Sequence, residues 1–129
     1  MTKMGLQIGL PWPPTVNTYW RSIVVKGRPR VLISKEGRAY REKVKNLLAG
    51  EIKDDGYFDG ERLKVHIAAM PPDRRSRDLD NILKSLLDSM QHAGVFRDDS
   101  QIDYLAVERH SVALLRKGGV IVTVEEIKP

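Results

Sequence analysis

The stretch LKVHIAAMPPDRRSRDLDNILKSLLDSM, residues 63–90, decides the fold that we expect from this sequence. Its first eight residues alternate in a way that predicts a strand with one apolar face, and two prolines end that strand. The apolar residues from position 83 onward recur at helical spacing, which predicts an amphipathic helix. Charges of both signs lie between the two elements, and this density is typical of a functional site: Asp73, Arg74, Arg75, Arg77, Asp78, Asp80 and Lys84.

Residues before this stretch predict a strand, a hairpin and a helix. Residues 6–10 alternate, and the prolines that follow stop the strand. Apolar triplets at 23–25 and 31–33 flank the basic tip 26–30, which predicts a short hairpin. Ser34 is placed to cap a helix over about residues 35–49, with an apolar stripe of Tyr40, Val44, Leu47 and Leu48.

Three aromatic residues, Trp12, Tyr19 and Trp20, lie in the expected loop between the first strand and the hairpin. The favoured interpretation is that they cap the core near that strand, since aromatic residues are most often core residues. The alternative is that they stack on the bases or sugars of a nucleic acid beside Arg21.

Residues after the stretch complete the expected fold. Gly94 is a natural C-terminal cap, residues 95–100 form a turn, and residues 104–108 form a strand. Residues 111–115 and 120–125 flank a Gly-Gly turn signal, which predicts a second hairpin. This order predicts one α+β domain over residues 1–129, with a mixed β-sheet and two α-helices packed on one face.

Composition limits the class of protein. The 129 residues are 41% hydrophobic and 30% charged, which predicts a folded, soluble domain. A net charge of +5 favours an anionic partner, whether nucleic acid, membrane surface or acidic protein. Cysteine is absent, which excludes disulfides and thiolate metal sites and favours a cytoplasmic location. We expect no membrane segment, because no apolar run approaches the roughly 20 residues needed to span a bilayer.

Asp78 and Asp80 are the first candidates for metal binding. In an extended segment, residues two apart point to the same side, about 6.6 Å apart along the chain, so one cation can bind both. Asp80 is also placed to cap the following helix. Lys84 lies four residues beyond Asp80, about 40° around the helix axis and off its apolar stripe. Two carboxylates with water and a substrate phosphate are a suitable ligand set for Mg²⁺.

Phosphodiester hydrolysis commonly needs a further carboxylate, because it often uses two metal ions. The pair Asp98 and Asp99, which follows the second helix, is the best candidate, and Asp88 and Asp103 are weaker ones. Asp88 also has a simpler interpretation, which is an ion pair with Lys84 at i+4.

Arg74, Arg75 and Arg77 have planar donors suited to phosphate oxygens and are candidates for DNA binding. The alternative is that they pair with the three aspartates of the stretch in an ion network without chemistry. Local spacing leaves these two interpretations in about equal balance.

Four motifs are spread over nearly the whole length of the chain. Residues 10–14 (LPWPP) followed by Asn17 lie near the start, and residues 34–41 (SKEGRAYR) lie at the first helix. Residues 72–81 (PDRRSRDLDN) with Lys84 form the middle, and residues 93–102 (AGVFRDDSQI) follow the second helix. An arginine-rich segment that runs into Asp-Leu-Asp-Asn, with an Asp-Asp turn at this interval, is a specific combination. By these motifs the chain resembles the RusA family of Holliday-junction resolvases over nearly its whole length.

The resemblance implies an enzyme that nicks four-way DNA junctions with the help of Mg²⁺ or Mn²⁺. By position, Asp78, Asp80 and Asp99 correspond to the acidic metal-binding set, Lys84 to a catalytically important lysine and Arg77 to a basic residue at the site. It also implies a homodimer, and a two-fold dimer presents two identical sites to the two opposed strands of a junction. Phosphate contacts from lysine and arginine would supply most of the affinity and make it fall with salt.

Our hypothesis from these residues is that water activated by the metal attacks the phosphodiester in line, while Lys84 and Arg77 stabilise the developing charge. Two hypotheses compete with it. One is a basic junction-binding protein without catalysis, against which the three acids and Lys84 argue. The other is a structural dimer whose Asp/Arg cluster is only an ion network.

Overall fold

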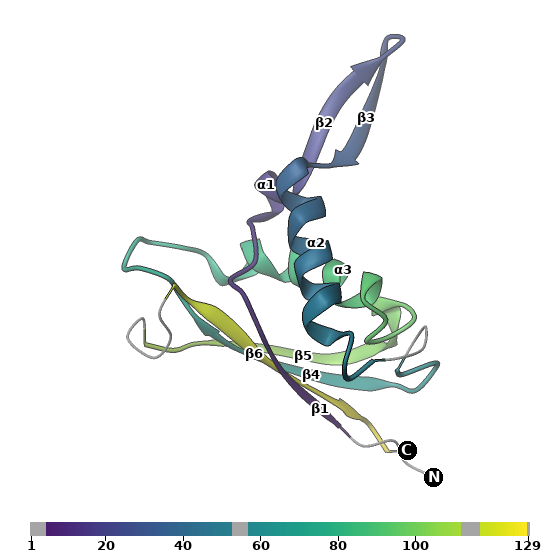
Figure 1. Ribbon diagram of the computed structural model, residues 1–129, viewed down its shortest axis with the longest axis vertical. Helices are drawn as coiled ribbons and strands as arrows, with labels where there is room; N and C mark the ends of the chain where they lie inside the picture. Colours follow the sequence, from purple (N-terminus) through teal and green to yellow (C-terminus); the bar gives the residue numbers. More distant parts are fainter. Residues whose placement is uncertain (1–4, 53–56, 112–116, 129) are drawn as a thin grey trace.

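The computed structural model describes residues 5–52, 57–111 and 117–128 (Figure 1). Its strands are β1 (Leu6–Leu10), β2 (Trp20–Val25), β3 (Arg28–Ile33), β4 (Leu63–Met70), β5 (Ile102–Arg109) and β6 (Gly119–Glu126). The α-helices are α1 (Val16–Tyr19), α2 (Lys35–Leu48) and α3 (Leu83–His92). Two short 3-10 helices, η1 (Leu79–Ile82) and η2 (Asp99–Gln101), precede α3 and β5. None of the described helices is long and apolar enough to cross a membrane.

Four strands form the main sheet, in the order β1-β6-β4-β5. Strand β4 pairs with β5 in parallel and with β6 in antiparallel orientation, so the sheet is mixed as predicted. Every second residue of β4 is fully buried: Leu63, Val65, Ile67 and Ala69. Helices α2 and α3 pack against these residues and cover one face of the sheet (Figure 1). The predicted α+β fold with two helices on one face is therefore confirmed.

The two main helices bury the faces that their sequence periodicity predicts, with one exception. Helix α3 buries Leu86 and Met90, and helix α2 buries Gly37, Tyr40, Val44 and Leu48. Leu47 is 53% exposed, so its prediction as a core residue is wrong. The buried residues of α2 are spaced by three or four positions in a single narrow stripe, and Leu47 lies beside that stripe rather than on it.

Strands β2 and β3 form a sheet of their own, which projects from the body of the molecule (Figure 1). The turn between them is Lys26-Gly27, and both residues have positive φ, 51° and 74°, as expected for a tight two-residue hairpin turn. The hairpin is therefore longer than predicted, and its turn is shorter. Before it, the expected loop contains the one-turn helix α1, in which Tyr19 is fully buried, so the core interpretation holds for this aromatic residue.

The second predicted hairpin is wrong. Residues 120–124 of β6 pair with β1 on one edge, and the whole of β6 pairs with β4 on the other. Both edges of residues 120–124 are therefore occupied, and residues 112–115 of the predicted partner strand 111–115 lie outside the described part of the chain. Alternation identified β6 as a strand, but its partners come from distant parts of the sequence.

Strands β4 and β5 are joined through α3 in a parallel crossover that positions the charged stretch. Residues 71–78 leave the carboxyl end of β4, and the chain returns through α3 to the amino end of β5, beside which η2 lies. Gly118 supports the start of this segment, because its φ is +75° and a Cβ there would lie 2.6 Å from the nitrogen of Pro72. The charged stretch therefore begins at the carboxyl ends of β4 and β5, and η2 lies at their amino ends. The two ends are separated by the roughly 25 Å length of an eight-residue strand.

Candidate functional site

Asp78 and Asp80 lie where the charged stretch enters η1. Asp78 is the extended residue before η1, with φ −88° and ψ 131°, and its side chain makes no capping hydrogen bond. Asp80 lies in the first turn of η1, so its prediction as a helix cap is wrong. The predicted extended geometry is also wrong, because a 3-10 helix with about three residues per turn does not place residues two apart on one side. Both side chains are exposed, and neither carboxylate has a hydrogen-bond or ion-pair partner among the described residues.

The ion network of this segment forms around Asp73 instead. Arg77 Nη1 lies 2.7 Å from Asp73 Oδ1, and Arg75 Nε lies 3.5 Å from Asp73 Oδ2. The hydrogen bond from Arg77 and the one from the backbone N–H of Arg75 lower the pKa of the Asp73 carboxyl to about 2. The structural interpretation of the arginines therefore applies to Asp73, while Asp78 and Asp80 remain available to a ligand.

The three arginines are not equivalent. Arg77 is 22% exposed, donates to the carbonyl oxygens of Asp73 and Arg75, and lies 5.9 Å from the ring centroid of Trp12. It braces the segment, whereas Arg74 is exposed and the Arg75 side chain is 83% exposed. Trp12, Arg77 and Asp78 line a hollow of about 230 Å³ beside η1.

Lys84 is exposed on the first turn of α3 and makes no ion pair with any carboxylate of the described residues. Its Nζ lies 5.9 Å from the ring centroid of Trp20, the first residue of β2. Lys84 and Trp20 together line a second and larger hollow of about 540 Å³ between α1, the hairpin and α3. A cationic side chain without a carboxylate partner in the described part of the chain, one turn from two carboxylates that are likewise unpaired there, is available to a phosphate.

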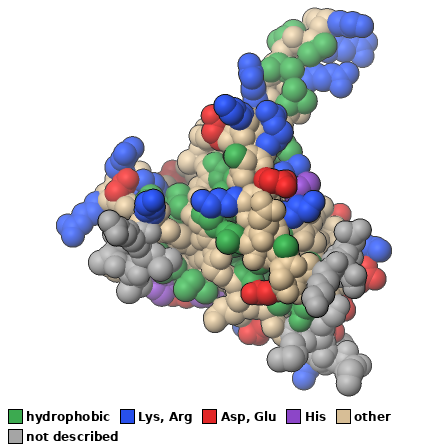
Figure 2. Space-filling view, viewed as in Figure 1, with side chains coloured by type: hydrophobic (Ala, Val, Ile, Leu, Met, Phe, Trp, Pro, Cys, Tyr) green, Lys and Arg blue, Asp and Glu red, His purple; other side chains and the backbone are tan. Residues whose placement is uncertain are grey.

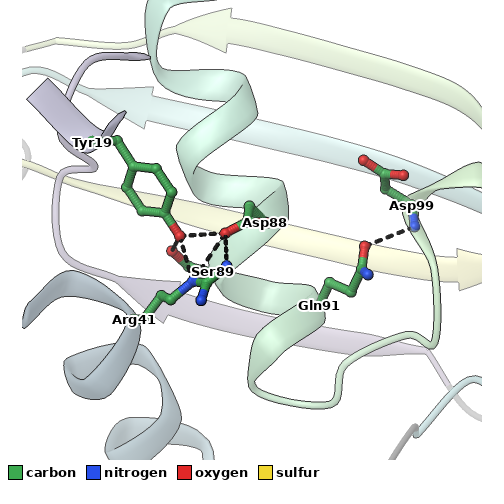
Figure 3. Close-up of polar contacts among 6 residues, drawn as sticks. All are labelled: Tyr19, Arg41, Asp88, Ser89, Gln91 and Asp99. Atoms are coloured by element: carbon green, nitrogen blue, oxygen red, sulfur yellow. Dashed lines mark hydrogen bonds and ion pairs between the residues drawn. The ribbon is translucent and has the colours of Figure 1, made fainter. Parts of the chain in front are cut away.

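Asp88 does not pair with Lys84, so that prediction is wrong. Arg41 Nη2 lies 2.6 Å from Asp88 Oδ2, and the Tyr19 hydroxyl donates to the same oxygen (Figure 3). Arg41 Nε also donates to the Tyr19 hydroxyl at 2.8 Å, and the Ser89 hydroxyl lies 3.3 Å from it. Burial, followed by the hydrogen bond to Asp88, raises the pKa of Tyr19. This cluster joins α1, α2 and α3 and occupies Asp88.

The Asp98–Asp99 turn is built at the carboxyl end of α3. Asp98 accepts a hydrogen bond from the Ser100 N–H at 2.8 Å and caps η2, and this bond lowers the pKa of Asp98. The N–H of Asp99 donates to Gln91 Oε1 at 3.1 Å, near the end of α3 and about one turn beyond Asp88 of the Arg41–Asp88 cluster (Figure 3). Asp98 therefore has a structural role.

The structure does not bring Asp99 to Asp78 and Asp80. Gln91, which holds Asp99, lies eleven residues after Asp80, and a helical path of this length advances by roughly 16 Å. Among residues 5–52, 57–111 and 117–128, no group of three or more His, Cys, Asp or Glu side chains is placed to hold a metal ion. Asp103 is also engaged elsewhere, because its carboxylate pairs with Arg62. A shared metal on all three acids thus stays a prediction.

Asp78 and Asp80 nevertheless suit a hard divalent cation. Their oxygens are free in the described part of the chain, and Mg²⁺ is commonly held by one or two carboxylates, water and substrate phosphate. Cationic side chains surround this position. Figure 2 shows lysine and arginine side chains gathered at the hairpin tip, around the hairpin base and at the end of the molecule formed by residues 71–78 in Figure 1. This distribution suits a polyanion that extends across the molecule.

Two residues of this region carried no sequence signal for the contacts they make. Arg41 lies in a motif of the resemblance but is 47 residues from Asp88, and Tyr19 is 69 residues from it. Asn17, which lines the larger hollow with Lys84, likewise lies in the proline-rich motif without a role assigned to it. Co-variation of these residue pairs among relatives is the kind of sequence signal that indicates such contacts.

A family model described as "Endodeoxyribonuclease RusA" matches residues 11–125, which contain both hollows, Asp78, Asp80, Lys84 and Asp99. The chain belongs to the RusA family. It is 45% identical over 103 residues to the "Crossover junction endodeoxyribonuclease rusA" of Enterobacteria phage HK97, covering 80% of this chain and 81% of the relative. The protein of the same name from Enterobacteria phage 82 is 42% identical over 102 residues, covering 78% and 80%. The RusA protein of Escherichia coli strain K12 is 40% identical over the same share of each chain.

Proposed function

We propose that this RusA-family chain is a structure-selective endodeoxyribonuclease that resolves four-way DNA junctions by hydrolysing phosphodiester bonds. The observation that carries the proposal is the pair of carboxylates of Asp78 and Asp80, one turn from the Lys84 cation, all three without an ion-pair partner among the residues that the structure describes. The names of the relatives, which are crossover junction endodeoxyribonucleases, support the same substrate class. A DNA substrate and a chain without cysteine fit a cytoplasmic enzyme.

We assign Mg²⁺, or Mn²⁺ in its place, to the carboxylates of Asp78 and Asp80. When bound there, the cation lowers the pKa of water and neutralises charge on the scissile phosphate. Lys84 contacts a non-bridging phosphate oxygen and stabilises the negative charge that develops during in-line attack. Arg74 and Arg75 extend into solvent and hold the neighbouring phosphates of the strand. Arg77 keeps this segment in place through Asp73 and remains close enough to the site to share in charge stabilisation.

The enzyme acts as a homodimer, because a four-way junction offers two equivalent strands to two equivalent sites. The dimer also offers a route for Asp99 to reach the metal. Within one chain, Asp99 lies beside the amino end of β5, whereas Asp80 follows the segment that leaves the carboxyl end of β4. In a two-fold pair, each contact from one surface to another occurs twice, so Asp99 of each chain can complete the carboxylate set of its partner.

Replacing Asp80 by asparagine tests the metal assignment. We expect Asp80→Asn to slow Mg²⁺-dependent nicking of a synthetic four-way junction by at least about 100-fold, a scale typical of losing one charge-stabilising group. Junction binding in EDTA should change little, because phosphate contacts supply most of the affinity. The matched control is Asp59→Asn, which removes an exposed acid that pairs with Arg97 at the surface. Nicking by Asp80→Asn at the wild-type rate would show that the site lies elsewhere.

The same assay separates catalysis from binding alone. A wild-type protein that binds junctions and leaves them intact at every Mg²⁺ concentration would be a non-catalytic junction-binding protein. A linear duplex serves as the control for structure selectivity. If the protein bound the junction and the duplex with equal affinity and nicked both at equal rates, it would not be structure-selective.

Mixed dimers test how Asp99 acts. Asp80→Asn and Asp99→Asn chains, each inactive alone, are refolded together so that mixed dimers form. Such a dimer retains one intact site only when Asp99 acts across the dimer, because the two substitutions then fall in the same site. We expect about one quarter of wild-type nicking from a 1:1 mixture, as single-strand nicks. An inactive mixture would show that the acids act within one chain.

A further inference from the structure

Apart from Lys84, none of the residues that line the larger hollow has a role in the hydrolysis proposed above. The hollow has a volume of about 540 Å³ and is lined by Val16, Asn17, Trp20, Ser22, Val31, Lys84 and Asp88. Its walls come from α1, both strands of the hairpin and α3, so three consecutive elements of the chain meet a helix that is distant in sequence. This volume lies in the range of about 300–1,000 Å³ that ligand sites usually have.

The walls of this hollow suit a flat heterocycle. Trp20 supplies an aromatic wall, and Val16 and Val31 supply aliphatic ones. Asn17 is exposed at the hollow and offers an amide with one acceptor and two donors, which matches the edge of a nucleobase. Lys84 carries a cation at the same hollow, close to the face of Trp20. Aromatic stacking, an amide and a cation are the three groups that hold a base and its phosphate.

Trp20 itself lacks a partner that a buried donor normally has. Its indole N–H is shielded from solvent and makes no hydrogen bond to any described residue of the chain. Buried indole N–H groups are usually paired, so an unpaired one at a ligand-sized hollow points to an acceptor that arrives from outside the chain. The sugar and phosphate oxygens of a nucleotide are such acceptors, because the N–H points along the plane of the indole ring and a base stacked on the ring face lies out of its reach.

We propose that this hollow binds one unstacked nucleobase of the junction, next to the phosphate that is cut. The base stacks on Trp20, Asn17 reads its edge, and Lys84 holds the phosphate of the same nucleotide. Extruding a base costs least where its pairing or stacking is already weakened, and stacking is interrupted at a branch point, which favours capture at the junction over capture from linear duplex. Trp20 and Asn17 therefore determine sequence preference at the cleavage site, while Asp78 and Asp80 perform the hydrolysis.

The test measures binding without cleavage, on an Asp80→Asn background in EDTA. Single nucleotides around the branch point of a four-way junction are replaced in turn by abasic sites. We expect one position at which loss of the base weakens binding about ten-fold or more, a scale typical of one stacked base. In Trp20→Ala, the same abasic site should cause no further loss. Trp20→Phe keeps a ring and should restore part of the abasic effect, and it serves if Trp20→Ala does not fold.

Asn17→Ala tests the reading of the base edge, through the rates at which the otherwise wild-type enzyme nicks junctions that differ only in that base. We expect the ratio between the best and worst bases to fall at least about five-fold, because a base-edge contact of this kind is removed. The matched controls are Tyr104→Ala, an exposed aromatic residue on β5, and Asn46→Ala, an exposed amide on α2. Both controls should keep the abasic effect and the base preference.

The outcomes separate this inference from the proposed function on which it rests. A wild-type protein that neither binds nor nicks junctions would refute both. Normal nicking with an abasic effect of equal size in Trp20→Ala and its parent would refute the base site alone. If Trp20→Ala changed the oligomeric state of the DNA-free protein and left the abasic effect unchanged, the hollow would belong to the dimer interface and the proposal would be overturned.

Discussion

Replacing Arg41 by methionine should destabilise the fold, because the cluster that joins α1, α2 and α3 depends on this guanidinium. Arg41 makes three contacts: Nη2 and Nε lie 2.6 Å and 3.0 Å from Asp88 Oδ2, and Nε lies 2.8 Å from the Tyr19 hydroxyl. Methionine retains much of the apolar stem and removes all three. Asp88 would then keep only Tyr19 as a partner among the residues of the cluster.

The size of the effect follows from how far the ion pair is buried. The side chains of Arg41 and Asp88 are 23% and 27% exposed. Breaking a fully buried ion pair costs about 3–5 kcal/mol, and an exposed pair is worth about 0–1 kcal/mol. With a quarter of each side chain in water, we expect Arg41→Met to lower the free energy of unfolding by about 2 kcal/mol. For a domain of this size, that loss corresponds to a fall in Tm of about 8 °C.

Urea denaturation followed by circular dichroism measures this loss, with thermal melting as a second measurement. The double variant Arg41→Met/Asp88→Asn should recover about 1 kcal/mol, because it no longer holds an unpaired carboxylate. Arg97→Met is the matched control: Arg97 pairs with Asp59, and their side chains are 73% and 66% exposed. We expect a loss of less than about 0.5 kcal/mol for the control. Equal losses in Arg41→Met and Arg97→Met would refute the view that burial makes the Arg41 cluster important.

Two further perturbations test local packing and charge. Gly37→Ala should destabilise the protein by about 2 kcal/mol in urea denaturation, although alanine favours helices, because its Cβ would lie 2.5 Å from the Tyr19 carbonyl oxygen. Gly50→Ala is the control, because a Cβ at that position would meet no described atom within 4 Å. Equal stability of the two variants would contradict the predicted clash at Gly37. An NMR titration should find the pKa of Asp73 at about 2, below its ordinary 3.8, so its pairing is complete above the ordinary value and is lost as pH falls toward 2. Arg77→Gln should raise that pKa toward 3.8, and an unchanged value would show that Arg77 is not the cause.

The candidate site could be predicted from sequence only where its residues are neighbours along the chain. Asp78, Asp80 and Lys84 are within seven positions of one another and lie together at the start of η1 and α3. The number of residues between Asp80 and Asp99 does not determine where Asp99 lies in the fold. The crossover from β4 to β5 through α3 places Asp99 at the amino ends of these strands, whereas the charged stretch starts at their carboxyl ends.

Asp88 shows the same limit for charges. Sequence spacing offered it Lys84, four residues away, as a partner. The folded chain gives it Arg41 and Tyr19 instead, because packing of α2 and α1 against α3 brings these side chains to the inner side of the helix (Figure 3). An i+4 pair on a solvated helix face is worth only a few tenths of a kcal/mol and yields to contacts that are shielded from water.

The sequence by itself determined the elements of this protein, because strand and helix periodicity and turn residues act over a few positions. It predicted β1, β4 and β5, both long helices and the existence of the β2–β3 hairpin. Only the tertiary structure decided that β6 lies between β1 and β4, that the hairpin stands apart, and that Trp20 and Lys84 share a hollow. Those features depend on which apolar faces bury one another across the chain, and this choice has no signature within any single segment.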